Sequence, residues 1–151
     1  MLIRSDDLTS PEVHALLAAH LDEMHSLSPP GSVHALPLDD LRKPGVTFWT
    51  AWCAGELMGC GALLELSPTH GEVKSMRTAP AHRRKGVGRD MLLSILGEAR
   101  RRGYRRLSLE TGSAPAFEPS RRLYRSLGFE CCPPFGNYVE DPHSAFMTLV
   151  L

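Results

Sequence analysis

Hydrophobic positions recur along the chain at two different intervals, which divide it into predicted strands and predicted helices. Strand-like alternation or β-branched and aromatic runs cover residues 2–4, 46–53, 56–66, 72–78, 105–111 and 145–151. Helical spacing covers 10–27, 87–102 and 120–127, and one short helical turn is expected around 38–42. A further short strand is expected directly after the last helix, so the order is β-α-(α)-β-β-β-α-β-α-β-β. This order predicts a single α/β (α+β) domain over residues 1–151.

The boundaries of these elements carry their own signals. Ser10 and Pro11 predict the start of the first helix, because a hydroxyl caps free amides and proline suits the first turn. Residues 46–53 and 56–66 flank Ala54-Gly55 and read as a β-hairpin. Gly59 and Gly61 fall inside its second strand, where glycine indicates a bulge or the close approach of another group.

Residues 72–102 have the most informative pattern: a strand, a basic glycine-containing turn and an amphipathic helix. The alternation over 72–78 predicts that Glu72, Lys74, Met76 and Thr78 share one face of the strand. The turn 83–88 reads Arg-Arg-Lys-Gly-Val-Gly and leads into the helix. Free amides at a helix N-terminus, the helix dipole and glycines together favour a bound phosphate. Neither the P-loop nor the dinucleotide glycine fingerprint fits this turn.

Charge is uneven although the chain has a formal net charge of zero. Residues 74–106 hold eleven Lys and Arg against two acids, a net charge of +9. Cations near the end of the helix stabilise its dipole, but those at 83–85 and 89 oppose it unless an anion is bound. A ligand phosphate therefore explains them better than a nucleic acid, since the whole chain is neutral and only 7% aromatic.

Two motifs at this point resemble those of the GNAT acetyltransferase superfamily. Arg83-x-x-Gly86-x-Gly88 matches the family's pyrophosphate motif [Q/R]-x-x-G-x-[G/A], and residues 123–129, Leu-Tyr-Arg-Ser-Leu-Gly-Phe, match LY-x-x-x-GF. The resemblance covers residues 72–129 by motif and the remainder by element order. It implies a mixed, mostly antiparallel sheet of about seven strands flanked by helices. It also implies direct acetyl transfer from acetyl-coenzyme A to an amine.

The resemblance assigns the coenzyme to the strand, the turn and the helix start. The backbone of the strand, through Met76 and Thr78, is expected to pair with the pantetheine arm. Pyrophosphate is expected on the amides of residues 84–89, with basic side chains adding charge. The expected coenzyme-binding residues are Met76, Arg77, Thr78, Arg83, Arg84, Lys85, Gly86, Val87, Gly88 and Arg89.

An amine that is protonated at neutral pH needs a base before it can attack a thioester. Glu72 is the first candidate, because the histone-acetylating branch has its base eleven residues before the pyrophosphate motif, and Arg83 is eleven residues after Glu72. Glu110, at the end of the next strand, is the second. The resemblance implies that Tyr124 protonates the departing thiolate. Many members have an Asn that contacts the coenzyme or bound water at the position of Phe117. In this chain another residue must make that contact, or the site must be rearranged locally.

The acceptor is the least determined part of the reaction. Trp49, Glu65 and Tyr138 are expected to border it, and the nearby acids favour a small cationic amine or an amino-acid derivative. Protein N-termini or lysines, or a non-catalytic acyl-coenzyme A sensor, are the alternatives. The four cysteines and seven histidines show no metal-ligand spacing, so no metal is expected. No apolar run is long enough for a membrane span, which favours the cytoplasm, and a homodimer is compatible with the apolar last strand.

Overall fold

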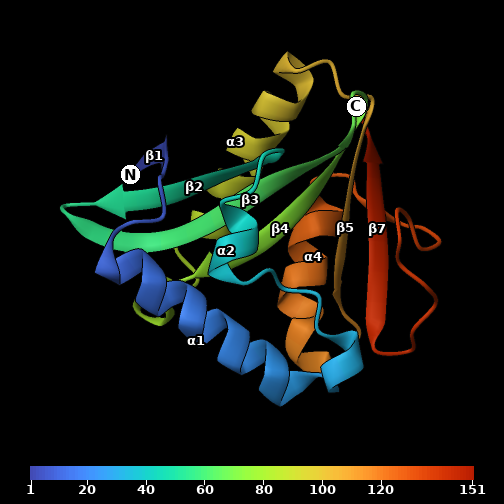
Figure 1. Ribbon diagram of the computed structural model, residues 1–151, viewed down its shortest axis with the longest axis horizontal. Coiled ribbons are helices and arrows are strands. Elements are labelled where there is room, and N and C mark those ends of the chain that lie inside the picture. The colour runs from blue at the N-terminus through green and yellow to red at the C-terminus, as the bar shows by residue number, and fades with distance from the viewer.

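The computed structural model describes residues 1–151 and has one sheet with helices on both of its faces (Figure 1). The expected order of elements is confirmed, with three additional single turns of 3-10 helix. The elements are β1 (Leu2–Ser5), α1 (Pro11–Leu27), η1 (Pro30–Ser32), α2 (Leu38–Leu41), β2 (Val46–Cys53), β3 (Glu56–Ser67), β4 (His70–Thr78), η2 (Pro80–His82), α3 (Val87–Arg101), β5 (Arg106–Gly112), η3 (Pro115–Phe117), α4 (Glu118–Ser126), β6 (Glu130–Cys131) and β7 (Ser144–Val150). No helix is long and apolar enough to span a bilayer.

Local chemistry explains where α1 starts. The Ser10 side chain accepts a hydrogen bond from the Val13 amide at 3.3 Å, and Pro11 occupies the first turn. Val13, Leu16 and Leu17 form its buried stripe. The predicted start of this helix is therefore confirmed.

The seven strands have the order β1-β2-β3-β4-β5-β7-β6, and every neighbouring pair except β4 and β5 is antiparallel. The parallel pair is short, since β4 meets β5 only at residues 70–72, opposite 106–108. Beyond this point the two strands have no paired residues. The edge of β4 that faces β5 is consequently without a strand partner from Val73 to Thr78.

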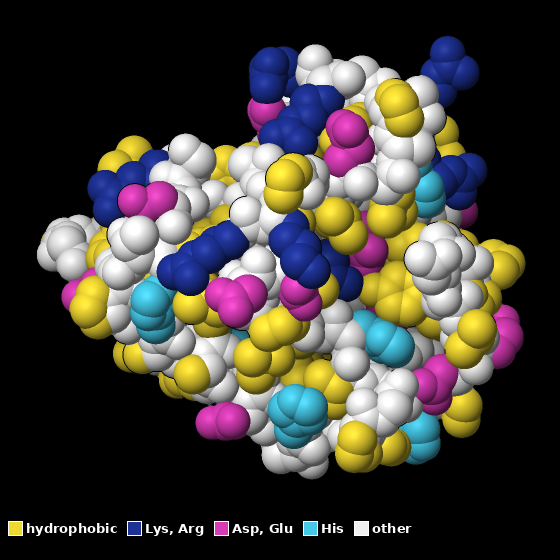
Figure 2. Space-filling view, viewed as in Figure 1, with side chains coloured by type: hydrophobic (Ala, Val, Ile, Leu, Met, Phe, Trp, Pro, Cys, Tyr) yellow, Lys and Arg dark blue, Asp and Glu magenta, His cyan; other side chains and the backbone are white.

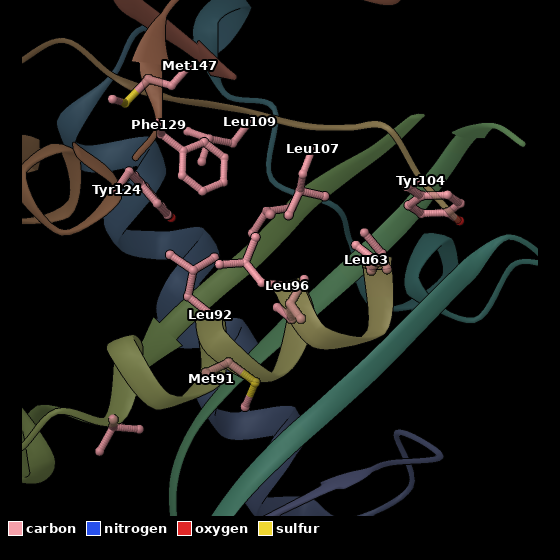
Figure 3. Close-up of a cluster of buried hydrophobic side chains, with 14 of the residues drawn as sticks. Leu63, Met91, Leu92, Leu96, Tyr104, Leu107, Leu109, Tyr124, Phe129 and Met147 are labelled. Carbon is pink, nitrogen blue, oxygen red and sulfur yellow. The ribbon is translucent and has the colours of Figure 1, made fainter. Parts of the chain in front are cut away.

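Each face of the sheet has its own hydrophobic core. One face packs against α1 and α2 through a cluster that includes Leu16, Leu41 and Phe48. The other packs against α3, whose Leu92 and Leu96 are directed at Leu107 of β5 (Figure 3). Tyr124 of α4 belongs to this second cluster, so α4 is fixed beside the point at which β4 and β5 diverge.

A β-bulge interrupts β4, and it corrects the predicted alternation over 72–78. Cys60 pairs with Arg77 and Ala62 with Lys74, so Gly61 alone faces Ser75 and Met76. Ser75 takes a left-handed φ of 54°, which is unusual for a residue with a side chain. The extra residue turns Met76 toward α3, away from the face that holds Lys74, so the expectation that the two share a face is wrong.

Gly61 is needed opposite this bulge. A Cβ at Gly61 would lie 2.8 Å from both Met76 Sδ and Met91 Cγ, closer than packed atoms can approach. The close approach predicted from this glycine is therefore confirmed. It lets α3 pack directly on the sheet beneath the bulge.

Candidate active site

A cavity of about 120 Å³ lies where β4 and β5 separate. Its walls come from β4, β5, η3, α4, the C-terminal half of α1 and the segment that follows α1. The lining residues are His20, Met24, Ser28, Ser32, Val33, His34, Ala35, Val73, Lys74, Ser75, Met76, Glu110, Thr111, Gly112, Phe117, Ser120 and Tyr124. The unpaired edge of β4 thus opens onto a space that is rich in both polar and apolar side chains.

Glu110 is the carboxylate on the wall of this cavity. It lies near the end of β5 and is largely buried. Burial raises its pKa from 4.5 to about 7, and the charge of Lys74 opposes part of this rise. A carboxyl group with a pKa near neutrality can accept a proton and release it again at physiological pH, as a general base must.

Tyr124 reaches the same cavity from α4. Its ring is buried and packs edge-on against Phe129, with the ring centroids 5.8 Å apart. Burial raises the pKa of the Tyr124 phenol above its usual value of 10.0, and the nearby charge of Glu110 adds to the rise. The phenol therefore stays protonated at neutral pH and can serve as a proton donor.

Glu72 occupies a different environment from Glu110. Its side chain is only 4% exposed, accepts hydrogen bonds from Lys74 Nζ at 3.0 Å and from the Tyr138 hydroxyl at 2.5 Å, and does not line the cavity. Tyr138 also accepts a hydrogen bond from Lys74 Nζ at 2.9 Å. Burial and the charge of Glu72 raise the pKa of Tyr138. Because two partners already hold Glu72, the geometry favours Glu110 over Glu72 as the base.

Two further polar side chains line the cavity without a hydrogen-bond partner in the protein. His20 Nδ1 and Ser75 Oγ are both buried and unpaired. Burial lowers the pKa of His20 to about 4, and the charge of Arg77 lowers it further, so the ring is neutral at pH 7. Buried polar atoms rarely remain unpaired, so these two atoms are available to a ligand or to water in the cavity.

The basic turn joins η2 to α3 and has the backbone of an anion-binding loop. Arg84 and Gly86 both have left-handed φ angles, of 63° and 82°, and Gly86 precedes the first residue of α3 without a side-chain cap. Successive amides in such a turn point toward one centre, where an anion can accept their hydrogen bonds. A Cβ added at Gly88 would lie 3.3 Å from Leu123 Cδ2 of α4. The turn is therefore adjacent to the helix that holds Tyr124.

Several cations of the basic run are neutralised by acids. Arg77 forms an ion pair with Glu23 of α1, Arg83 lies 3.6 Å from the same carboxylate, and Arg101 and Arg102 pair with Glu98. On the face drawn in Figure 2, Lys and Arg side chains are interspersed with Asp and Glu rather than gathered in one band. Arg84, Lys85 and Arg89 remain exposed at the turn. Three cations without an acidic partner thus lie at the turn, where they could attract phosphate, and Arg100, Arg105 and Arg106 lie away from it.

The structure brings together some of the predicted site residues and separates others. Met76, Glu110 and Tyr124 line the cavity, and Tyr138 lies behind it through Lys74. Trp49 instead packs against the core on the α3 side, and Glu65 accepts a hydrogen bond from Tyr104 at 2.6 Å. Neither Trp49 nor Glu65 lines the cavity: Trp49 lies on β2, two strands from β4, and Glu65 pairs with Gly71 at the end of β4 that is still joined to β5.

Four further residues that line the cavity were not predicted from the sequence: His20, His34, Lys74 and Ser75. His20 gave one signal, since a polar residue continues the buried stripe of Val13, Leu16 and Leu17. Ser75 gave none, because the bulge that exposes it depends on Gly61 across the strand pair.

No group of three or more His, Cys, Asp or Glu side chains could hold a metal ion.

Phe117, which stands where many family members have Asn, has a packing role in the structure. It is buried, lines the cavity and lies over Gly112, where a Cβ would be 2.2 Å from the Phe117 ring. The end of β5 therefore requires glycine beneath this ring. An aromatic wall replaces a polar contact at this position.

Comparisons with known proteins give a matching family model, related sequences and a related fold. A model of the acetyltransferase (GNAT) family matches residues 13–129. The uncharacterized N-acetyltransferase YsnE of Bacillus subtilis is 57% identical over 148 residues, covering 98% of each chain. An IAA acetyltransferase of Azospirillum brasilense is 42% identical over 80% of this chain and 78% of its own. A solved structure of a proposed acyl-CoA N-acyltransferase from Klebsiella pneumoniae superposes with a TM-score of 0.79 at 30% identity, covering 99% of this chain and 97% of its own.

Proposed function

The chain belongs to the acetyltransferase (GNAT) family and is an acyltransferase, and from this premise we propose its reaction. It transfers the acetyl group of acetyl-coenzyme A directly to a primary amine of a small molecule or amino-acid derivative. Both substrates are bound at once in a ternary complex. The observation that carries this proposal is that Glu110, Tyr124 and the unpaired edge of β4 meet at one cavity.

The donor is proposed to lie along β4 and the basic turn. The free edge of β4 from Met76 to Thr78 offers backbone groups to the pantetheine arm, as an added strand would. The side chain of Arg77 is engaged by Glu23, so it is not needed for this contact, which the backbone of Met76 and Thr78 makes. The amides from Arg84 to Arg89 receive the pyrophosphate, with exposed basic side chains close by.

Acetyl transfer then needs two proton movements at the cavity. Glu110 accepts a proton from the acceptor ammonium, directly or through water, so that the amine nitrogen can attack the thioester carbonyl. The new C–N bond forms and the C–S bond breaks. Tyr124 gives its proton to the departing thiolate of coenzyme A. The second proton, which the nitrogen loses as the amide forms, returns to Tyr124 directly or through water, and the first proton passes from Glu110 to solvent. The raised pKa of Glu110 and the protonated state of Tyr124 suit these two roles.

Initial rates at varied concentrations of both substrates test direct transfer. A ternary complex gives reciprocal plots that intersect, and intact mass spectrometry finds no acetylated protein. Parallel plots with a stable acetyl-protein would contradict the proposal. The panel of acceptors should include IAA, because the Azospirillum relative is named for it. It should also include peptides with free N-termini and lysines.

Replacing Tyr124 with phenylalanine is expected to lower kcat about tenfold or more, because a general acid typically contributes 10²–10⁴-fold and water replaces part of its function. Coenzyme affinity should change little, since the ring still packs against Phe129. Steady-state kinetics with a separate measurement of coenzyme binding checks both expectations. Full turnover of the Tyr124→Phe enzyme across the pH range would refute the acid role.

A further inference from the structure

Lys74 supplies a buried cation to the cavity wall. Its side chain is 8% exposed, and its ammonium donates to Glu72 at 3.0 Å and to the Tyr138 hydroxyl at 2.9 Å. An ammonium has three N–H donors, so one remains free. Burial of an ammonium is costly unless it is paired and hydrogen-bonded, and here the protein provides partners while leaving one donor for a ligand.

The position of Lys74 is fixed from several elements. Tyr138, in the loop between β6 and β7, bridges Lys74 and Glu72, and His34 packs edge-on against the Tyr138 ring at 5.0 Å. The Asp141 carboxylate of the same loop accepts a hydrogen bond of 2.5 Å from Ser32. The loop and the segment after α1 are thereby joined over Lys74. Such a supported side chain can orient a ligand without reorganisation.

Glu110 lies on the same cavity wall and carries the opposite charge when it is ionised. The two groups are close enough for the charge of Lys74 to act on Glu110. A cavity of about 120 Å³ with a cation and a carboxylate is complementary to a small ligand that carries both charges. A ligand with two amines would instead place its second cation against Lys74.

Neutral hydrogen-bonding groups complete the lining. His20 Nδ1 and Ser75 Oγ are unpaired, and the residues that bear them are 9% and 8% exposed. Both line the cavity with Lys74 and Glu110. An acceptor that carries several oxygen atoms would give these groups the partners that the protein does not provide.

We propose that the acetyl acceptor is a zwitterionic compound of the amino-acid class, with its carboxylate bound to Lys74 and its amine beside Glu110. This inference rests on the proposed acetyl transfer and specifies its acceptor. Lys74 is then a specificity residue, which recognises the part of the acceptor that does not react.

Matched acceptors test the proposal. L-phenylalanine, L-methionine and L-glutamate are each compared with the amine that lacks the α-carboxylate and with the α-methyl ester. Binding is measured by calorimetry with coenzyme A present, and kcat and KM are measured with acetyl-coenzyme A. For at least one set, the amino acid should bind about tenfold or more tightly than the amine and the ester, because a hydrogen bond to a charged group has roughly that effect. Binding with coenzyme A needs no turnover, so failure of acetyl transfer would not obscure the preference.

Variants of Lys74 assign the preference to this side chain. Lys74→Met should raise the ratio of the KM of the amino acid to the KM of the matched amine about tenfold or more; the ratio is used because the charge of Lys74 also acts on Glu110. Lys74→Arg keeps the charge and should retain a preference for the carboxylate. Because Lys74→Met leaves Glu72 unpaired, the double variant Lys74→Met/Glu72→Gln is measured as well, with thermal unfolding as a check on the fold. Equal binding of amino acids and their decarboxylated amines, or a preference that survives in the folded Lys74→Met variants, would overturn the proposal.

Discussion

Replacing Glu110 with glutamine is expected to lower kcat about 10²–10⁴-fold, the range typical of losing a general base. Glutamine has nearly the same shape, so the cavity should keep its form while the group that accepts the proton is lost. Steady-state measurement of coenzyme A release at saturating acceptor gives this value directly. No other side chain with the chemistry of a base lines the cavity except the neutral imidazoles of His20 and His34.

The pH dependence gives a second measure of the same residue. In the native enzyme, kcat/KM should rise with pH through about 7, because Glu110 acts only when it has lost its proton. In Glu110→Gln this inflection should be absent, and the residual rate should follow only the ionisation of the amine. The slope is read from kcat/KM between pH 5 and pH 9, a range chosen to span about two units on each side of the pKa.

The raised pKa of Glu110 also has a consequence for stability. The folded protein binds the Glu110 proton more tightly than the unfolded chain, for which the pKa is 4.5. The stability gained from this proton is complete below pH 4.5 and is lost as the pH rises through about 7. Glu110→Gln should therefore unfold at a higher temperature than the native protein above pH 7. An inactive variant that is more stable at high pH cannot owe its inactivity to misfolding.

Glu72→Gln is the matched control, since Glu72 is the base that sequence resemblance ranked first. It should disturb the hydrogen bonds to Lys74 and Tyr138 but retain the inflection near pH 7. If Glu72→Gln loses that inflection and Glu110→Gln keeps it, the base is Glu72 and the assignment made from geometry is wrong.

Replacing Gly86 with valine is expected to weaken coenzyme A binding about tenfold to a hundredfold. Gly86 has a φ of 82°, a conformation that costs a residue with a Cβ roughly 1–2 kcal/mol. A branched side chain also occupies the space in which the turn must approach phosphate. Each charge-assisted amide hydrogen bond lost contributes about 1.5–3 kcal/mol, which accounts for the expected loss. Calorimetric titration with coenzyme A measures the affinity.

Gly97→Val provides the control for this substitution. Gly97 lies in the middle of α3 with an ordinary helical backbone, and no atom lies within 4 Å of a Cβ at either glycine. A difference between the two variants therefore reflects the turn and its ligand, not crowding within the protein. Unchanged coenzyme affinity in Gly86→Val would show that pyrophosphate does not bind at this turn.

Sequence reasoning succeeded where function depends on a local pattern. The hairpin at residues 46–66, the start of α1 at Ser10 and the turn before α3 are each determined by neighbouring residues, and the structure has all three. Tyr124, which lines the cavity, was predicted in the same way, because its motif is contiguous. The order of elements was sufficient to anticipate the architecture of the sheet.

The choice of site residues was less successful where it depended on distant parts of the chain. Trp49 and Glu65 were chosen from strands that looked suitable, but a strand pattern does not reveal which end of the sheet opens. The distinction between Glu72 and Glu110 depends on burial and on partners more than sixty residues away, such as Tyr138. The bulge at Ser75 breaks the alternation that the sequence suggests, because tertiary packing at Gly61 overrides it.

Amine-dependent release of coenzyme A from acetyl-coenzyme A tests the proposed acetyl transfer and the role of Glu110 together. The assay uses a thiol reagent, corrected for the four cysteines of the protein, and a panel of amines, amino acids and peptides. We predict that at least one primary amine stimulates release, that its acetylated product appears in equal amount, and that Glu110→Gln abolishes nearly all of both. Tight binding of acetyl-coenzyme A without stimulation by any acceptor in the panel, or a rate unaffected by Glu110→Gln, would contradict this prediction.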